Sequence, residues 1–105
     1  MGIHKEQLKR ISEMEKILDE QNLKVAALRS ALDEFAPSLK RYEKLKDYYS
    51  GNGWRDDVES YERGEVPKEL KCGVLSEDAV YDLIGDTFDL AVDMLELATK
   101  IIKSH

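Results

Sequence analysis

A chain of 105 residues has room for one helical domain, residues 1–105, and none for a second. Its composition, 36% charged and 42% hydrophobic with two prolines and two phenylalanines, fits helical bundles and coiled coils better than sheets, so we expect strands to play no part in the fold. The net charge of −6 is concentrated in residues 51–105, which hold six Lys/Arg and thirteen Asp/Glu, so direct nucleic-acid binding is disfavoured and a basic protein partner is favoured.

The first predicted element is a helix of about 70 Å over about residues 3 to 49. Pro37 removes one helical hydrogen bond, so we expect a kink near residues 33 to 37, with a true break as the alternative. From Ile11 onward, apolar residues recur at alternating steps of three and four, the spacing of a coiled-coil seam. Ten of its twelve positions are apolar or aromatic: Ile11, Met14, Leu18, Gln21, Val25, Leu28, Leu32, Phe35, Leu39, Tyr42, Lys46 and Tyr49.

A stop and a short second helix follow. Two glycines and an asparagine in Ser50-Gly51-Asn52-Gly53 tolerate the positive φ angles with which a helix can end. Trp54, Val58 and Tyr61 then recur at i, i+4 and i+7, which predicts a short helix closed by Gly64.

The last predicted helix runs from about residue 77 to residue 103. Ser76 is the expected N-cap, and Glu77 and Asp78 in the first turn would meet the positive end of the helix dipole. Lys100 and Lys103 stand at the opposite, negative end.

The apolar face of this last helix is wider than one neighbouring helix can cover. We therefore predict an all-α helical hairpin or bundle that is completed by dimerisation, with a second copy of the chain as one partner. The seam is formed by Val80, Ile84, Thr87, Ala91, Met94, Ala98 and Ile101, and it is flanked by Tyr81, Phe88, Leu95 and Ile102 on one side and by Leu83, Leu90 and Leu97 on the other.

Five acidic residues stack on the opposite face of the same helix: Asp82, Asp86, Asp89, Asp93 and Glu96. Carboxylates at this spacing can bind a metal on a bundle helix. Because they occupy the outward positions, a solvated acidic face that meets a partner is the preferred interpretation. Glu59-x-x-Glu62 with Asp89-x-x-x-Asp93 also loosely resembles the acidic helices of magnesium-dependent all-α nucleotide pyrophosphohydrolases.

Other chemistry finds little support. The two histidines, His4 and His105, lie near the ends, and Cys72 has no second thiol for a redox or zinc motif. No phosphate-binding loop, signal peptide or apolar run of about 18 residues is present. We therefore expect a cytoplasmic protein that is not an enzyme, holds no cofactor or metal and enters no membrane.

Aromatic and charged residues gather around the first turn. Aromatics beside arginine and acids are typical of protein interfaces, so these residues are candidates for partner binding. In the alternative interpretation Trp54 and Tyr61 cap the end of the bundle while the charged residues face water. The cluster consists of Tyr48, Tyr49, Trp54, Arg55, Asp56, Asp57 and Tyr61.

The stretch Val66–Leu83, together with Tyr48-Tyr49 and Trp54-Arg55-Asp56-Asp57, resembles the small bacterial helical proteins classed as domain of unknown function 4298. Gly73-Val74-Leu75-Ser76-Glu77-Asp78 is the most specific part. The resemblance implies a compact helical protein and no particular activity. Cys72 stands where the resemblance leads us to expect a basic residue.

These observations favour a non-enzymatic, dimeric helical module that binds another protein through the aromatic cluster and the acidic face. One alternative is a magnesium-dependent, pyrophosphohydrolase-like enzyme. A third is an acidic regulator or phage-type inhibitor that occupies a basic protein groove through residues 82 to 96.

Overall fold

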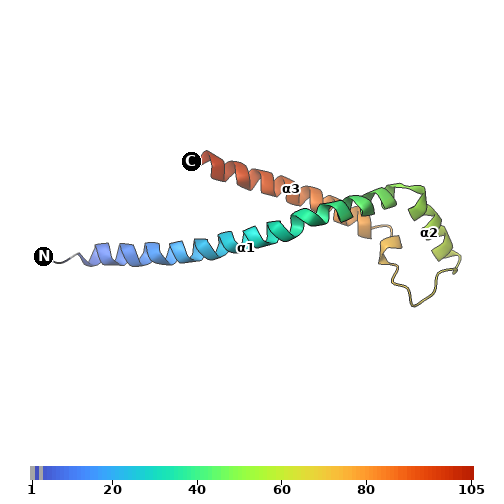
Figure 1. Ribbon diagram of the computed structural model, residues 1–105, viewed down its shortest axis with the longest axis horizontal. Coiled ribbons are helices and arrows are strands. Elements are labelled where there is room, and N and C mark those ends of the chain that lie inside the picture. The colour runs from blue at the N-terminus through green and yellow to red at the C-terminus, as the bar shows by residue number, and fades with distance from the viewer. Residues whose placement is uncertain (1, 3) are drawn as a thin grey trace. The chain divides into compact units, whose positions relative to one another are not determined.

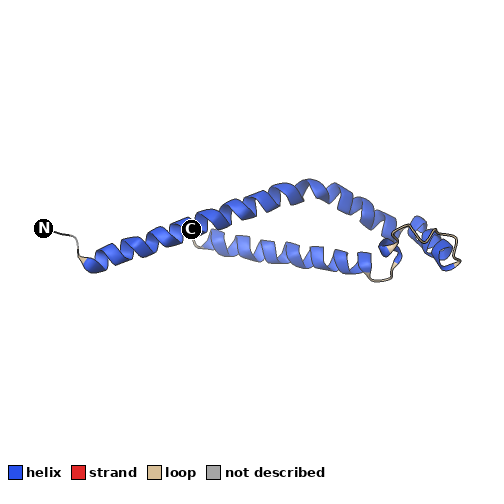
Figure 2. Ribbon diagram, turned by 90° about the horizontal axis from the view of Figure 1, so that it is seen from below, coloured by secondary structure: helices blue, strands red, loops and turns tan. Residues whose placement is uncertain are grey.

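A computed structural model describes residue 2 and residues 4–105 of the chain. Its elements in chain order are α1 (Lys5–Ser50), α2 (Asn52–Glu62), the 3-10 helix η1 (Gly73–Leu75) and α3 (Ala79–Lys103) (Figure 1). Helices and loops alone make up this described part, without a strand (Figure 2). The all-α class with a long first helix is thereby confirmed. The chain divides into two compact units, Met1–Lys40 and Arg41–His105.

Helix α1 continues through Pro37 to Ser50, so the alternative of a true break is wrong. Residue 3, where the sequence placed the start of this helix, lies outside the described residues. Near the proline, the Ser38 hydroxyl donates to the Phe35 carbonyl at 2.6 Å. Within the first unit, the described residues belong to α1 as far as Lys40 or precede it, and their seam is exposed; Leu18, for example, is 53% exposed.

A single residue, Gly51, separates α1 from α2. Its backbone is extended, with φ −103° and ψ 178°, so the positive φ expected in the stop at residues 50 to 53 does not occur. Glycine is favoured there for lack of space, because a Cβ on Gly51 would lie 3.2 Å from the Asp47 carbonyl oxygen. The position of the stop was therefore predicted correctly, but for the wrong physical reason.

Gly64 ends α2 as the sequence predicted, and its φ of +75° is in the left-handed region that favours glycine. The Gly64 N–H donates to the Tyr61 carbonyl at 3.0 Å, and the Glu65 N–H donates to the Ser60 carbonyl at 3.0 Å. These two hydrogen bonds form a Schellman motif, which satisfies carbonyls that the end of the helix would leave unpaired.

Helix α3 begins at Ala79 with Asp78 at its N-cap, so the predicted start at residue 77 and the predicted cap at Ser76 are wrong. Ser76 closes η1 instead, where its hydroxyl donates to the Gly73 carbonyl at 2.9 Å. The same hydroxyl still accepts the Ala79 N–H at 3.2 Å, so it satisfies one N–H at the start of α3. Lys100 and Lys103 lie in the last turn as expected.

The second unit is connected through η1, which lies close to both α2 and α3, whereas no Cα atom of α2 lies within 8 Å of a Cα atom of α3. Val80, 3% exposed, is the one buried residue in the described part of the chain. Along the rest of α3 the apolar face is open, with Phe88 69% exposed and Leu95 68% exposed. Exposed apolar faces of this extent indicate an oligomer or a partner. The hairpin or bundle arrangement and the dimer stay predictions.

Within the described residues, no helix combines the length and the apolar character that crossing a bilayer requires.

Gly64 and Gly85 provide a matched test of this backbone description. Gly64→Ala should lower the free energy of unfolding by about 1 kcal/mol, because a Cβ is strained at positive φ. Gly85→Ala should raise it by up to about 1 kcal/mol, because Gly85 lies inside α3 and a Cβ there would meet nothing within 4 Å. Urea unfolding followed by circular dichroism measures both changes. Equal stability of Gly64→Ala and the parent protein would contradict the assigned helix end.

Candidate functional site

Three aromatic residues lie where α1 meets α2, and two of them hydrogen-bond to residues 74 and 77, in η1 and just after it. The Trp54 indole N–H donates to the Val74 carbonyl at 2.9 Å. The Tyr49 ring meets the Trp54 ring edge-on, with 5.0 Å between centroids and 64° between planes. The Tyr49 hydroxyl reaches the Glu77 carbonyl at 3.5 Å. The end of α1 and the start of α2 are thereby tied to the segment that precedes α3.

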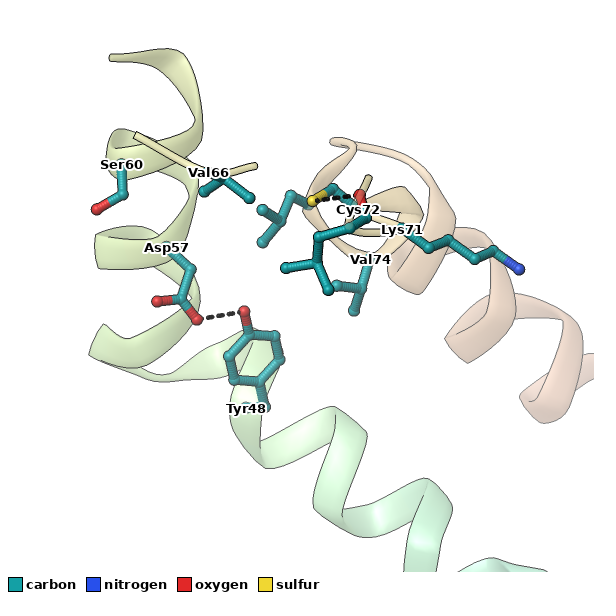
Figure 3. A pocket seen from close by; sticks show the side chains of 9 residues that line it. Tyr48, Asp57, Ser60, Val66, Lys71, Cys72 and Val74 are labelled. Atoms are coloured by element: carbon teal, nitrogen blue, oxygen red, sulfur yellow. Dashed lines mark hydrogen bonds between the residues drawn. The ribbon is translucent and has the colours of Figure 1, made fainter. Parts of the chain in front are cut away.

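Tyr48, the third aromatic residue, donates its hydroxyl to a carboxylate oxygen of Asp57 at 2.7 Å (Figure 3). Tyr48 is half-buried at the end of α1, and Asp57 is exposed on α2. Partial burial of the ring, followed by the hydrogen bond to Asp57 and the negative charge of Asp57, raises the pKa of Tyr48 to about 12. The Tyr48 hydroxyl therefore stays protonated at neutral pH and acts as a donor.

Beside this pair lies an open hollow of about 290 Å³ whose walls are mainly apolar (Figure 3). The Cys72 thiol, at its edge, donates to the Leu70 carbonyl at 3.3 Å. Figure 3 shows the Lys71 side chain extending away from Tyr48 and Asp57. The hollow offers apolar contact with one polar end, which suits an apolar side chain more than a charged ligand. Its lining residues are Tyr48, Asp57, Ser60, Val66, Leu70, Lys71, Cys72, Val74 and Leu75.

The other members of the aromatic cluster are turned to solvent on α2. Arg55 and Asp56 are exposed, and neither makes a side-chain hydrogen bond or ion pair with a described residue. Tyr61 is 52% exposed. The structure thus brings Tyr48, Tyr49, Trp54 and Asp57 together and leaves Arg55, Asp56 and Tyr61 apart, available to a partner.

The five acidic residues of α3 form a separate stripe that is exposed along its whole length: Asp82, Asp86, Asp89, Asp93 and Glu96. Arg63 and Glu65, at 2.7 Å, make the one ion pair between described residues. The stripe is therefore without a cation of its own in this part of the chain. Because it gathers five negative charges on one face, it can attract a basic surface.

The acidic pairs that resemble a pyrophosphohydrolase motif are not brought together. Glu59 and Glu62 lie on α2, whereas Asp89 and Asp93 lie on α3, and no Cα atom of one helix lies within 8 Å of a Cα atom of the other. Among the described residues, no group of three or more His, Cys, Asp or Glu side chains is placed to hold a metal ion.

Sequence reasoning missed the part of the site that η1 and the loop before it contribute. Val74 provides the acceptor for Trp54, and Leu70 and Cys72 line the hollow. The one available signal was Gly73 followed by two apolar residues, which marks a turn with something to cover. The partner of that turn lies 20 residues earlier in the chain, at Trp54, and no local pattern records it.

Fold and site together define a small all-α protein with an aromatic junction and an unpaired acidic helix face. The chain belongs to the DUF4298 family, described as a domain of unknown function, whose model matches residues 11–97. This confirms the resemblance found in the sequence. No curated protein matches the chain.

The Tyr48–Asp57 hydrogen bond predicts a tyrosine titration that can be assigned. One of the five tyrosines should lose its proton near pH 12, and Asp57→Asn should move that titration toward the ordinary value of 10.0. Absorbance of the phenolate measures it, and Asp56→Asn, a neighbouring exposed acid without this hydrogen bond, is the matched control.

The direction of the Tyr48 pKa shift determines how the free energy of unfolding changes with pH. A pKa that is raised on folding means that the folded state favours the protonated hydroxyl. The stabilisation from Tyr48 should therefore be complete below pH 10 and be lost as the pH rises toward about 12. An Asp57→Asn protein with an unchanged titration would show that the Asp57 carboxylate does not contribute to the raised pKa of Tyr48.

Trp54→Phe tests the junction itself. The substitution keeps an aromatic ring but removes the N–H that the Val74 carbonyl accepts, so the free energy of unfolding should fall by about 1 kcal/mol. Tyr49→Phe removes only the longer 3.5 Å hydrogen bond to Glu77 and should cost less. Denaturation followed by circular dichroism compares the two. A larger loss for Tyr49→Phe would reverse the assigned importance of these bonds.

Proposed function

We propose that this protein is a non-enzymatic helical module that forms a homodimer and binds a second protein. The observation that carries the proposal is the imbalance between buried and exposed apolar residues. In the described chain one residue is buried, while ten large hydrophobic residues on α1 and ten on α3 are exposed. Burial of one leucine side chain contributes about 2 kcal/mol, so covering even part of either face supports association.

The apolar residues on both helices are spaced for packing between helices. On α1 they recur at the three- and four-residue steps of a coiled-coil seam. On α3 they occupy a face that is wide enough for two neighbours. A second copy of the chain supplies further helices of matching length, which supports the homodimer.

Two surfaces remain for another protein once apolar faces are covered. The acidic stripe of α3 lies opposite the apolar face of the same helix, so a dimer that covers one leaves the other in solvent. At the α2 end, Arg55, Asp56 and Tyr61 add an arginine and an aromatic residue, which are enriched where interfaces derive most of their energy. The partner we propose is therefore a protein with a basic surface.

A regulator that occupies a basic nucleic-acid groove of another protein is a second candidate within the same chemistry. The unpaired acidic stripe supports it, because five carboxylates in a row can imitate the charge of a phosphate backbone. The two candidates differ in what the captured protein normally binds.

The first experiment is light scattering on the purified protein, combined with capture of partners from a bacterial lysate. We expect a solution mass of twice 12.1 kDa and a partner whose binding weakens as salt is raised. Arg55→Ala and Asp89→Asn should each reduce recovery of that partner severalfold while the helical circular dichroism stays unchanged.

Arg63→Ala is the control for these variants, because it also removes an arginine, one that is engaged locally with Glu65. Its recovery of the partner should equal that of the parent protein. A monomeric mass would contradict the homodimer. Partner binding that is indifferent to salt and to both substitutions would contradict the proposed surfaces.

A further inference from the structure

The residues beside the α1 seam change character along the helix. Over residues 10–29, here called the coil segment, four of the six flanking positions are charged: Arg10, Glu15, Lys24 and Arg29, with Ile17 and Asn22 at the other two. Over residues 30–45 the flanks are mostly small or apolar: Ala31, Ala36, Ser38, Glu43 and Leu45. A narrow seam between charged flanks is the pattern of a two-stranded coiled coil, whereas small or apolar flanks suit a wider bundle.

The side chains of the coil segment are free to take part in such pairing. Its apolar seam residues are open to solvent, with Ile11 48%, Leu18 53% and Val25 64% exposed. The charged flanking residues are exposed as well and make no ion pair between described residues. The coil segment therefore has an exposed apolar seam, and the charged residues on either side of the seam make no ion pair with a described residue.

The charge of these flanking residues determines which helix can pack on the seam of the coil segment. On α3 the flanking positions are apolar, with Leu83, Leu90 and Leu97 along one side. Packing such a helix on the coil segment would take charged groups such as Arg10 and Lys24 out of water without supplying partners. A second coil segment has the same narrow seam and keeps its own charged flanks in solvent.

Gln21 then selects the orientation. It lies in the seam between Leu18 and Val25. In a parallel, in-register pair each seam residue faces its own copy, so the two Gln21 amides can hydrogen-bond to each other. In an antiparallel pair centred on the coil segment, Gln21 instead faces an apolar residue and its amide is left without a partner.

The flanking charges do not oppose this choice. A parallel pair places Arg10 near Glu15 of the second copy, which is favourable, and Lys24 near Arg29 of the second copy, which is unfavourable. These exposed contacts are of similar size and opposite sign, and each is weaker than the cost of an unpaired buried amide.

We propose that two copies of the protein associate through the coil segment as a parallel, in-register, two-stranded coiled coil. The inference rests on the self-association proposed above and specifies its surface and its orientation. The Gln21 pair fixes the register, because a shift by one heptad would place both amides against apolar residues.

Cysteine cross-linking tests the orientation. In a Cys72→Ser background, Gln21→Cys should form a disulfide-linked dimer in most of the protein under mild oxidation, since the two positions face each other across the seam. Glu20→Cys, one residue away at an outward position, should remain largely uncross-linked. A dimer in which Gln21→Cys does not cross-link would overturn the parallel arrangement.

A matched pair of leucine substitutions tests the surface. Leu18→Glu places a charge in the seam and should convert the dimer to a monomer by light scattering. Leu23→Glu makes the same change at an outward position, 73% exposed, and should leave the dimer intact. Fluorescence of Trp54, the one tryptophan, reports whether the second unit stays folded in both variants.

The outcomes separate this inference from the function on which it rests. A monomeric parent protein would remove the homodimer and the coiled coil together. A dimeric parent whose Leu18→Glu variant stays dimeric would keep the homodimer but place its interface elsewhere, which overturns the inference. Loss of the dimer in Leu18→Glu alone, with cross-linking at residue 21, would establish it.

Discussion

The hydrogen bond from the Trp54 indole to the Val74 carbonyl is the contact on which the second unit depends. The Cα atoms of helices α2 and α3 stay more than 8 Å apart, and η1 is the element that lies close to both. The path of the chain from α2 to α3 is therefore set by how η1 is held against Trp54, with support from the Tyr49 hydroxyl at Glu77. A three-residue turn anchored by one side chain replaces the extensive helix packing of an ordinary small bundle.

Because the elements of the chain pack so little against one another, the apolar faces of both long helices stay exposed to solvent. A helix in water gains little stability from propensity alone and depends on packing of an amphipathic face. With Val80 as the one buried residue described, intrachain packing provides little of that stability. The association proposed above would supply packing for these exposed faces. The two faces also differ, since the coil segment is narrow with charged flanks and the α3 face is wide with apolar flanks, so they call for different neighbours.

Features set by neighbouring residues could be predicted from the sequence. The seam spacing identified α1, and Gly64 was recognised as the end of α2 because its conformation depends on the local chain. Ser76 shows the limit of such reasoning. Its hydroxyl does accept the Ala79 N–H, but it also donates to the Gly73 carbonyl, so Ser76 caps the end of η1 and the helix begins later than predicted. The Trp54–Val74 contact joins distant residues and has no local pattern to reveal it.

Some of the seven residues of the aromatic cluster make contacts within the unit, and the others are exposed to solvent. The composition of the chain could not show this division. Four of them use their polar groups in hydrogen bonds within the unit: Tyr48, Tyr49, Trp54 and Asp57. These contacts make the four side chains a rigid support, because hydrogen-bonded and stacked side chains have lost their rotational freedom before any partner binds. Arg55, Asp56 and Tyr61 lie exposed on the short helix α2, and their side chains make no such contacts with described residues. We therefore propose that these three exposed residues contact a partner while the other four stabilise the unit, so substitutions at the two sets of positions should affect binding and folding separately.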